Sequence, residues 1–179
     1  MYLETDEGRQ YADMAARFLK ILEQYKKNVP EGGDKYEDTL HLAILQNLVT
    51  HVADNEKLQK SLGNICLGVD GEKIFVCGEF LKKDADKDKS FEVLLCIHLR
   101  HALSHPSLSS KDYDEALSSK GCDNIKNIKT GYFAKEANGN LAEYIFCRNR
   151  GGICVIRLTV EQVREITKKL AGYLSSLLP

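Results

Sequence analysis

The end of a strongly apolar segment near the middle of the chain carries side chains that are able to do chemistry. Within six residues it holds Arg100, His101, Ser104 and His105. Arg and His are costly to bury unless they are paired. A guanidinium grips phosphate oxygens, and an imidazole exchanges protons near neutral pH. The group is therefore suited to hold a phosphate at Arg100 and to move protons at His105.

The run Arg100-His101-Ala102-Leu103-Ser104-His105 resembles the R-x4-H motif of the HEPN superfamily, the all-helical domains that include many metal-independent ribonucleases. A polar residue directly after the Arg is also typical of that family, and here it is His101. The resemblance implies an endoribonuclease that uses no metal and no cofactor and cuts RNA by attack of the 2′-hydroxyl. It implies Arg100 and His105 as catalytic residues, with His101 as a third.

The segment before the motif strengthens the resemblance. Residues 36–45 are similar to the second helix of HEPN nucleases from bacterial plasmids and defence islands. The resemblance thus implies a toxin or phage-defence effector, with RNA and an antitoxin as partners. One position departs from the branch of HEPN toxins that a partner enzyme adenylylates, because Ser107 stands where that branch has a tyrosine. This difference disfavours regulation by that modification.

The spacing of the motif predicts a second copy of the chain as a partner. Five residues at about 100° each place Arg100 and His105 about 140° apart around a regular helix. Within one such helix they would not make a neat contact. A cleft between two copies would bring both into one site, as in the dimeric active site of HEPN nucleases, so we expect a homodimer.

Further positions are candidates for substrate binding. Ser104 is able to hydrogen-bond substrate, and an alternative is a bond back to its own helix. Residues 120–179 carry 10 Lys and Arg against 5 Asp and Glu, whereas residues 1–119 carry 15 against 21. This asymmetry predicts a modest basic surface for a polyanion, led by Arg148, Arg150 and Arg157. The alternative is an ordinary solvated surface.

Other interpretations of the motif remain open. His101 and His105 have the H-x3-H spacing that places two imidazoles on one metal, but no Glu lies between them and no third ligand is evident, so we expect no metal site. A second alternative is a non-catalytic HEPN-like module for dimerisation or for RNA or nucleotide binding. In that case the Arg and His side chains pair with carboxylates at an interface.

Length and composition favour one cytoplasmic domain. A chain of 179 residues is most economically a single domain, here 1–179. No apolar run is long enough to cross a membrane, and the acidic start lacks a signal-peptide core, so we expect a cytoplasmic protein without membrane contact. The six cysteines contain no C-x2-C pair, which favours reduced, mostly buried thiols.

Hydrophobic periodicity predicts helices in the first part of the chain and again at its end. The expected helices are residues 11–27, 35–60, 90–105, with Ser90 as N-cap, and a last one that begins at a capping box in Thr159–Gln162. A short helix is expected at 112–119. Residues 61–81 are left open, with Ile74–Cys77 as a short strand or the start of a helix, and 81–89 are expected to be a solvated loop or a fraying helix end.

Between residues 128 and 158 the period shifts toward two, which predicts three strands. Turn signals at Asn138-Gly139 and Arg150-Gly151 separate them. A two-residue turn at the second place would set Cys147 opposite Cys154. The expected fold class is therefore mainly α, a HEPN-like helical bundle with a small antiparallel β-meander before the last helix.

Overall fold

The computed structural model describes residues 6–29, 36–62, 67, 75–77, 88–105, 129–137, 140–149 and 153–177. The helices are α1 (Asp6–Asn28), α2 (Tyr36–Asp54), α3 (Glu56–Leu62), α4 (Phe91–Leu103) and α6 (Val160–Ser176). The strands are β1 (Phe75–Cys77), β2 (Gly131–Ala137), β3 (Asn140–Asn149) and β4 (Ile153–Thr159). The expected fold is confirmed in its coarse form, because the described chain is mainly helical with a small antiparallel sheet before the last helix.

The second predicted helix, residues 35–60, is in fact two helices. Asn55 divides them, because its Oδ1 accepts hydrogen bonds from the backbone N–H groups of Lys57 and Leu58 at 3.0 and 3.2 Å. An Asn side chain used in this way caps the start of a new helix. The expectation of one continuous helix was therefore wrong at this residue, and α2 ends at Asp54.

Caps at two other helices match the sequence. Ser90 accepts a hydrogen bond from the backbone N–H of Val93 and so begins α4. Thr159 and Gln162 form a reciprocal capping box at the start of α6. These local signals were sufficient because each cap satisfies backbone groups only three residues away.

The sheet has four strands in the order β1-β4-β3-β2, all paired antiparallel. The predicted meander of β2, β3 and β4 is confirmed. β1 comes from the segment 61–81 that the sequence pattern did not resolve, and it adds a fourth strand beside β4. The turns expected at Asn138-Gly139 and Arg150-Gly151, and the short helix expected at 112–119, lie outside the described residues.

The register of β3 and β4 corrects the predicted cysteine pair. Cys147 lies opposite Val155, and Cys154 lies opposite Arg148. The connection therefore spans one residue more than the expected two-residue turn, and a shift of one residue moves side chains to the other face of the sheet. Cys147 and Cys154 point to opposite faces, and both are buried free thiols.

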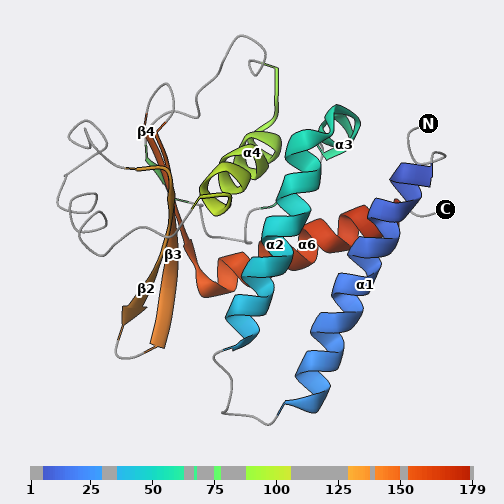
Figure 1. Cartoon of the computed structure of the whole chain (residues 1–179), viewed down its shortest axis with the longest axis horizontal. Helices are drawn as coiled ribbons and strands as arrows, with labels where there is room; N and C mark the ends of the chain where they lie inside the picture. Colours follow the sequence, from blue (N-terminus) through green and yellow to red (C-terminus); the bar gives the residue numbers. More distant parts are fainter. Residues whose placement is uncertain are drawn as a thin grey trace.

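The helices and the sheet form layers that hold α4 in the middle. Figure 1 shows α4 between the sheet and α2, with α6 crossing α2 and α1. Tyr144, Phe146 and Ile156 on one face of the sheet join Leu95 and Leu99 of α4 in one apolar core. The motif helix is thus packed on two sides, and it reaches solvent at Phe91 near its start and at Arg100 and His101 near its end. None of the helices in the described part of the chain is both long and apolar enough to cross a membrane.

Candidate functional site at the end of the motif helix

The C-terminal end of α4 presents the motif to solvent. Ala102 and Leu103 are buried, Arg100 and His101 are partly exposed, and Ser104 and His105 are exposed. The helix ends at Leu103, two residues before His105, and the backbone N–H of His105 donates to Ala102 O in a tighter turn. The angle of about 140° expected for one regular helix therefore does not apply. Both Arg100 and His105 reach solvent at the same end of α4.

Arg100 has fewer hydrogen-bond partners than its guanidinium can serve. Its Nη2 lies 3.4 and 3.5 Å from the two carboxylate oxygens of Asp54 on α2, which are long contacts for an ion pair. Within the described part of the chain its Nε is buried without a hydrogen-bond partner. The side chain is 32% exposed and that of Asp54 is 56% exposed. A guanidinium in this state has donors left for a phosphate group.

The last turn of α4 is fixed against α2. Gln46 Nε2 donates to Leu103 O at 3.1 Å, which satisfies one of the carbonyls that a helix leaves open at its C-terminus. Leu103 thus meets Gln46, whereas Arg100 meets Asp54, so the two helices run in opposite directions here. The position of the motif depends on both contacts with α2.

Ser104 uses its side chain within the helix. Its Oγ donates to Arg100 O at 2.8 Å. Of the two alternatives for this residue, the bond back to its own helix is the one that the structure has. As an acceptor the hydroxyl remains exposed at the helix end.

The predicted basic surface is not assembled from the arginines named for it. Arg148 is only 5% exposed, and its Nη1 lies 3.1 Å from His98 Nε2 beneath α4. It lies on the core face of β3, so its assignment to a basic surface was wrong. Arg157 forms a bidentate pair with Glu143 at 2.9 to 3.1 Å. Arg150 lies outside the described residues.

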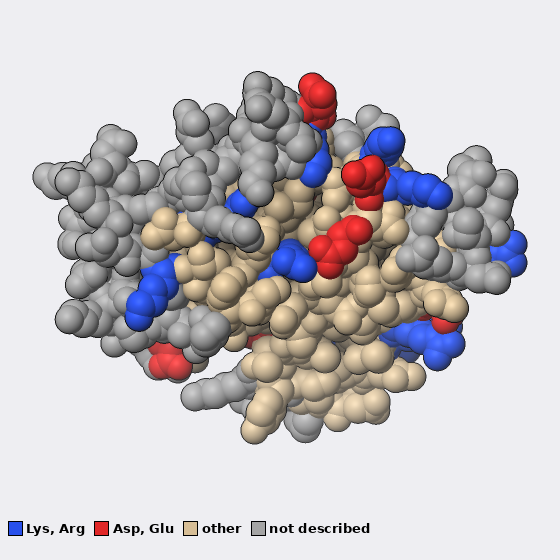
Figure 2. Space-filling model, turned by 45° about the horizontal axis from the view of Figure 1, so that its top comes forward, with Lys and Arg blue, Asp and Glu red and all other residues tan. Residues whose placement is uncertain are grey.

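The charges on the surface are likewise not gathered into a basic patch. On the face in Figure 2, most Lys and Arg groups stand apart from one another, and several lie beside Asp or Glu. A broad uncharged area lies among them. No continuous basic patch appears among the described residues on this face.

Two residues of α2 that lie at the site, Gln46 and Asp54, are not indicated by any sequence motif. Both contact α4. They are 46 to 57 residues away from their partners along the chain. No local pattern indicates such pairs, because packing of α2 on α4 brings them together.

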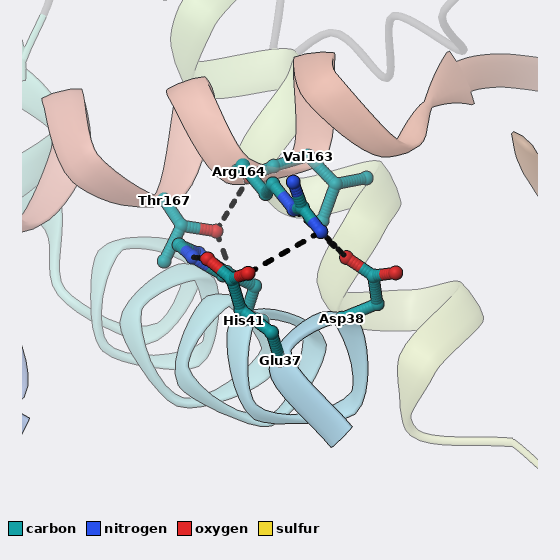
Figure 3. A network of polar contacts seen from close by, with 6 residues as sticks. All are labelled: Glu37, Asp38, His41, Val163, Arg164 and Thr167. Carbon is teal, nitrogen blue, oxygen red and sulfur yellow. Dashed lines mark hydrogen bonds and ion pairs between the residues drawn. The ribbon is translucent and has the colours of Figure 1, made fainter. Parts of the chain in front are cut away.

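A second polar cluster joins α2 to α6 away from the motif (Figure 3). Arg164 contacts Asp38 at 2.7 Å and Glu37 at 3.5 Å, and Thr167 donates to Val163 O at 2.6 Å. The His41 ring is fully buried in this interface, and burial followed by the charges of Lys168 and Arg164 lowers its pKa to about 4. The cluster fixes how α2 lies on α6 and does not face solvent at His41.

Two of the buried cysteines, Cys96 and Cys154, are not suited to nucleophilic chemistry. Burial raises the pKa of the Cys96 thiol to about 12, and burial raises that of Cys154 to about 11. Among the described residues, no three His, Cys, Asp or Glu side chains converge as metal ligands.

Comparison with family models finds no match, and neither curated proteins nor solved structures show a significant similarity to this chain. The resemblance to HEPN domains rests on the motif and on the residues that precede it.

Proposed function

We propose that the chain is a HEPN-like, metal-independent endoribonuclease whose site lies at the exposed end of α4. Arg100 holds the scissile phosphate and stabilises the charge that develops on it. His105 transfers protons, with His101 beside it on the preceding turn. RNA is the substrate, and its cleavage requires no cofactor.

The observation that carries this proposal is the state of Arg100. It stands in the last turn of α4, is 32% exposed and has long contacts to Asp54, and His105 is exposed two residues beyond the end of the helix. Because the side chain is partly exposed and its two contacts with Asp54 are long, its Nη groups keep donor capacity. A phosphate oxygen would supply an acceptor for these groups.

The chemistry needs no metal because RNA carries its own nucleophile. The 2′-oxygen attacks the adjacent phosphorus, its proton passes to a base, and the bond from phosphorus to the 5′-oxygen breaks. That leaving oxygen takes a proton from an acid. The products are a 2′,3′-cyclic phosphate and a 5′-hydroxyl, and Arg100 neutralises charge on the phosphoryl oxygens throughout.

A homodimer is part of the proposal. From Thr39 to Ala53, helix α2 carries no Asp, Glu, Lys or Arg, and its exposed residues in this stretch are Thr39, Ala43, Gln46 and Asn47. This uncharged face adjoins the end of α4, because Gln46 contacts Leu103. A second copy seated on it would bring two motif ends together. A role as a cytoplasmic toxin or phage-defence effector, with an antitoxin partner, follows from the resemblance.

The test is RNA cleavage in EDTA by the wild type and by the Arg100→Ala and His105→Ala variants. We expect the wild type to yield 2′,3′-cyclic phosphate ends and each variant to lose about a hundredfold or more in rate. Size exclusion and circular dichroism should be unchanged. Cleavage that EDTA abolishes would contradict the metal-independent mechanism.

Arg17→Ala is the matched control. Arg17 is an exposed arginine that pairs within α1 with Asp13 at 2.8 Å, so its removal also deletes one cation and one carboxylate contact. We expect its cleavage rate to equal that of the wild type. An equal loss in Arg17→Ala would indicate that net charge, rather than the motif, controls the rate.

The alternative function is a non-catalytic module for dimerisation or for RNA or nucleotide binding. The ion pair between Arg100 and Asp54 favours it, because a structural role for the motif requires such a carboxylate partner. It predicts RNA binding that survives His105→Ala and weakens with salt, with no cleaved product. Absence of cleavage over a range of RNAs, together with such binding, would favour this function.

A further inference from the structure

Asp54 lies beside the part of Arg100 that the proposed function gives to the substrate. Arg100 Nη2 is 3.4 Å from one carboxylate oxygen of Asp54 and 3.5 Å from the other. A phosphate that binds this guanidinium therefore meets a carboxylate next to the same nitrogen. The substrate and Asp54 thus compete for one donor group.

The pair between Arg100 and Asp54 is loose compared with another arginine pair of this chain. Arg164 and Arg100 are both 32% exposed, but Arg164 contacts Asp38 at 2.7 Å. Asp38 is 14% exposed, whereas Asp54 is 56% exposed. Charge-assisted hydrogen bonds normally span about 2.7 to 2.9 Å, and exposed ion pairs stabilise a protein little. A phosphate is therefore able to displace the Asp54 carboxylate from Arg100.

The backbone that carries Asp54 is anchored, so its charge stays near the site. Asp54 is the last residue of α2. Gln59 Nε2 donates to Val52 O at 3.1 Å and to Ala53 O at 2.8 Å, which satisfies carbonyls at the end of this helix. A displaced Asp54 side chain can turn toward solvent, but its Cα remains in place. Its negative charge therefore still acts on a phosphate bound to Arg100.

Displacement and repulsion depend differently on the charge of the ligand. Displacing the carboxylate costs the same free energy for every phosphate, whereas the remaining repulsion grows with the ligand's charge. An RNA phosphodiester carries one negative charge. A phosphomonoester, at the end of a chain or in a free nucleotide, carries nearly two at pH 7, because its second pKa is about 6. Asp54 therefore repels the monoester more strongly.

We propose that Asp54 is a specificity-determining residue of the Arg100 site, where its carboxylate disfavours doubly charged phosphomonoesters relative to the singly charged phosphodiesters of RNA. This inference rests on the proposed function, because it takes Arg100 as the group that holds phosphate. Internal linkages are then preferred to the phosphorylated ends of chains, and free nucleotides compete poorly with RNA.

The experiment is displacement of a fluorescent 2′-O-methyl RNA at pH 7.5 by 2′-O-methyladenosine 3′-monophosphate and by its methyl ester. None of the three has a 2′-hydroxyl for cleavage, and the two competitors differ by one negative charge. Fluorescence anisotropy gives the affinity of each competitor for the wild type and for Asp54→Asn. We expect Asp54→Asn to bind the methyl ester about threefold and the monophosphate about tenfold more tightly than the wild type does.

Further variants separate the charge at this position from other effects. Asp54→Glu keeps the charge, so the ratio of the two affinities should stay that of the wild type. Asp54→Ala removes the same charge and replaces Asp54→Asn if the latter does not fold. Asp13→Asn is the matched control, because Asp13 is 55% exposed and also contacts an arginine, Arg17, but lies on α1. Both affinities should be unchanged in Asp13→Asn.

The outcomes separate this inference from the proposed function. If removal of the Asp54 charge changes the ratio of the two affinities no more than Asp13→Asn does, the role of Asp54 is overturned. If the wild type binds none of the three probes, or Arg100→Ala leaves both affinities unchanged, both proposals are overturned. If the ratio shifts as expected but the wild type does not cleave RNA in EDTA, the role of Asp54 is supported and the ribonuclease activity alone is overturned.

Discussion

At the residue scale, Arg100 and Arg148 show how one side-chain type takes two roles in this chain. Arg148 is enclosed between β3 and α4 and contacts His98, whereas Arg100 ends at the surface beside an exposed carboxylate. The buried guanidinium has lost its water and depends on protein partners. The partly exposed one retains donors that a ligand is able to use.

These surroundings predict opposite consequences of truncation. Arg148→Ala should lower the free energy of unfolding by roughly 2 to 4 kcal/mol, because it opens a cavity and leaves His98 without this contact. RNA binding per folded molecule should stay unchanged. Arg100→Ala should reduce RNA cleavage and binding with little change in stability. Urea unfolding measures the free energy of unfolding, and fluorescence anisotropy measures the affinity for RNA. A loss of RNA affinity in Arg148→Ala would show that Arg148 does take part in RNA binding.

A pH dependence of stability follows from His41. Its pKa of about 4 in the folded chain lies below its ordinary value, so the unfolded chain binds the proton more readily. The stability that the neutral His41 ring contributes is therefore fully present above its ordinary pKa. This contribution is lost as the pH falls toward the pKa of the folded chain. Burial is the main cause of the lowered pKa; Lys168, Arg164 and Lys26 lower it further, Asp38 opposes them, and Glu37 also faces the ring.

The measurement is urea unfolding of the wild type and His41→Leu at pH 7.5 and pH 5. Between these two pH values the wild type should lose about 2 kcal/mol more than the variant, because Leu does not titrate. Parallel losses in both proteins would contradict a buried neutral His41.

At the element scale, contacts between α2 and its neighbours decide where the motif lies. Gln46 satisfies a carbonyl at the end of α4, and Asp54 holds the Arg100 side chain beside it. Arg164 of α6 fixes the other end of α2 through its contacts with Glu37 and Asp38 (Figure 3). Helix α2 thus positions the motif through contacts that its own sequence pattern does not indicate.

The bond from Gln46 to Leu103 O predicts a measurable contribution. Gln46→Ala should lower the free energy of unfolding by about 1 kcal/mol, as for a typical side-chain hydrogen bond. It should also loosen the last turn of α4, which hydrogen exchange of the Ser104 and His105 amides would detect. Asn47→Ala is the control, since Asn47 is the exposed neighbour on the same helix. Equal effects of both substitutions would show that this bond does not hold the turn.

At the scale of the whole molecule, the uncharged face of α2 is the surface we propose for a second copy. A charge placed in its middle should oppose association, because an interface centre tolerates few unpaired charges. We expect Ala43→Glu to convert a dimer into a folded monomer in light scattering after size exclusion. Arg17→Glu, on the exposed side of α1, should leave the dimer intact. A wild type that is monomeric at assay concentrations would contradict this part of the proposal.

The sequence by itself determined the features whose causes are local. Ser90 and Thr159 cap helices through bonds to residues three positions away, and alternation of apolar residues specified the three consecutive strands. The break of the second helix at Asn55 also has a local cause, but its apolar pattern continued past the cap and concealed it. The motif from Arg100 to His105 was readable as chemistry because residue type and spacing alone indicate it.

Only the tertiary structure decided what depends on packing between distant segments. It buried Arg148 against His98, shifted the register of β3 and β4 so that the cysteines face apart, and added β1 to the sheet. It also placed Asp54 and Gln46 against the end of α4. Such contacts join residues that are far apart in the chain, and they form because burial of one common apolar core favours this packing. A local sequence pattern therefore does not predict them.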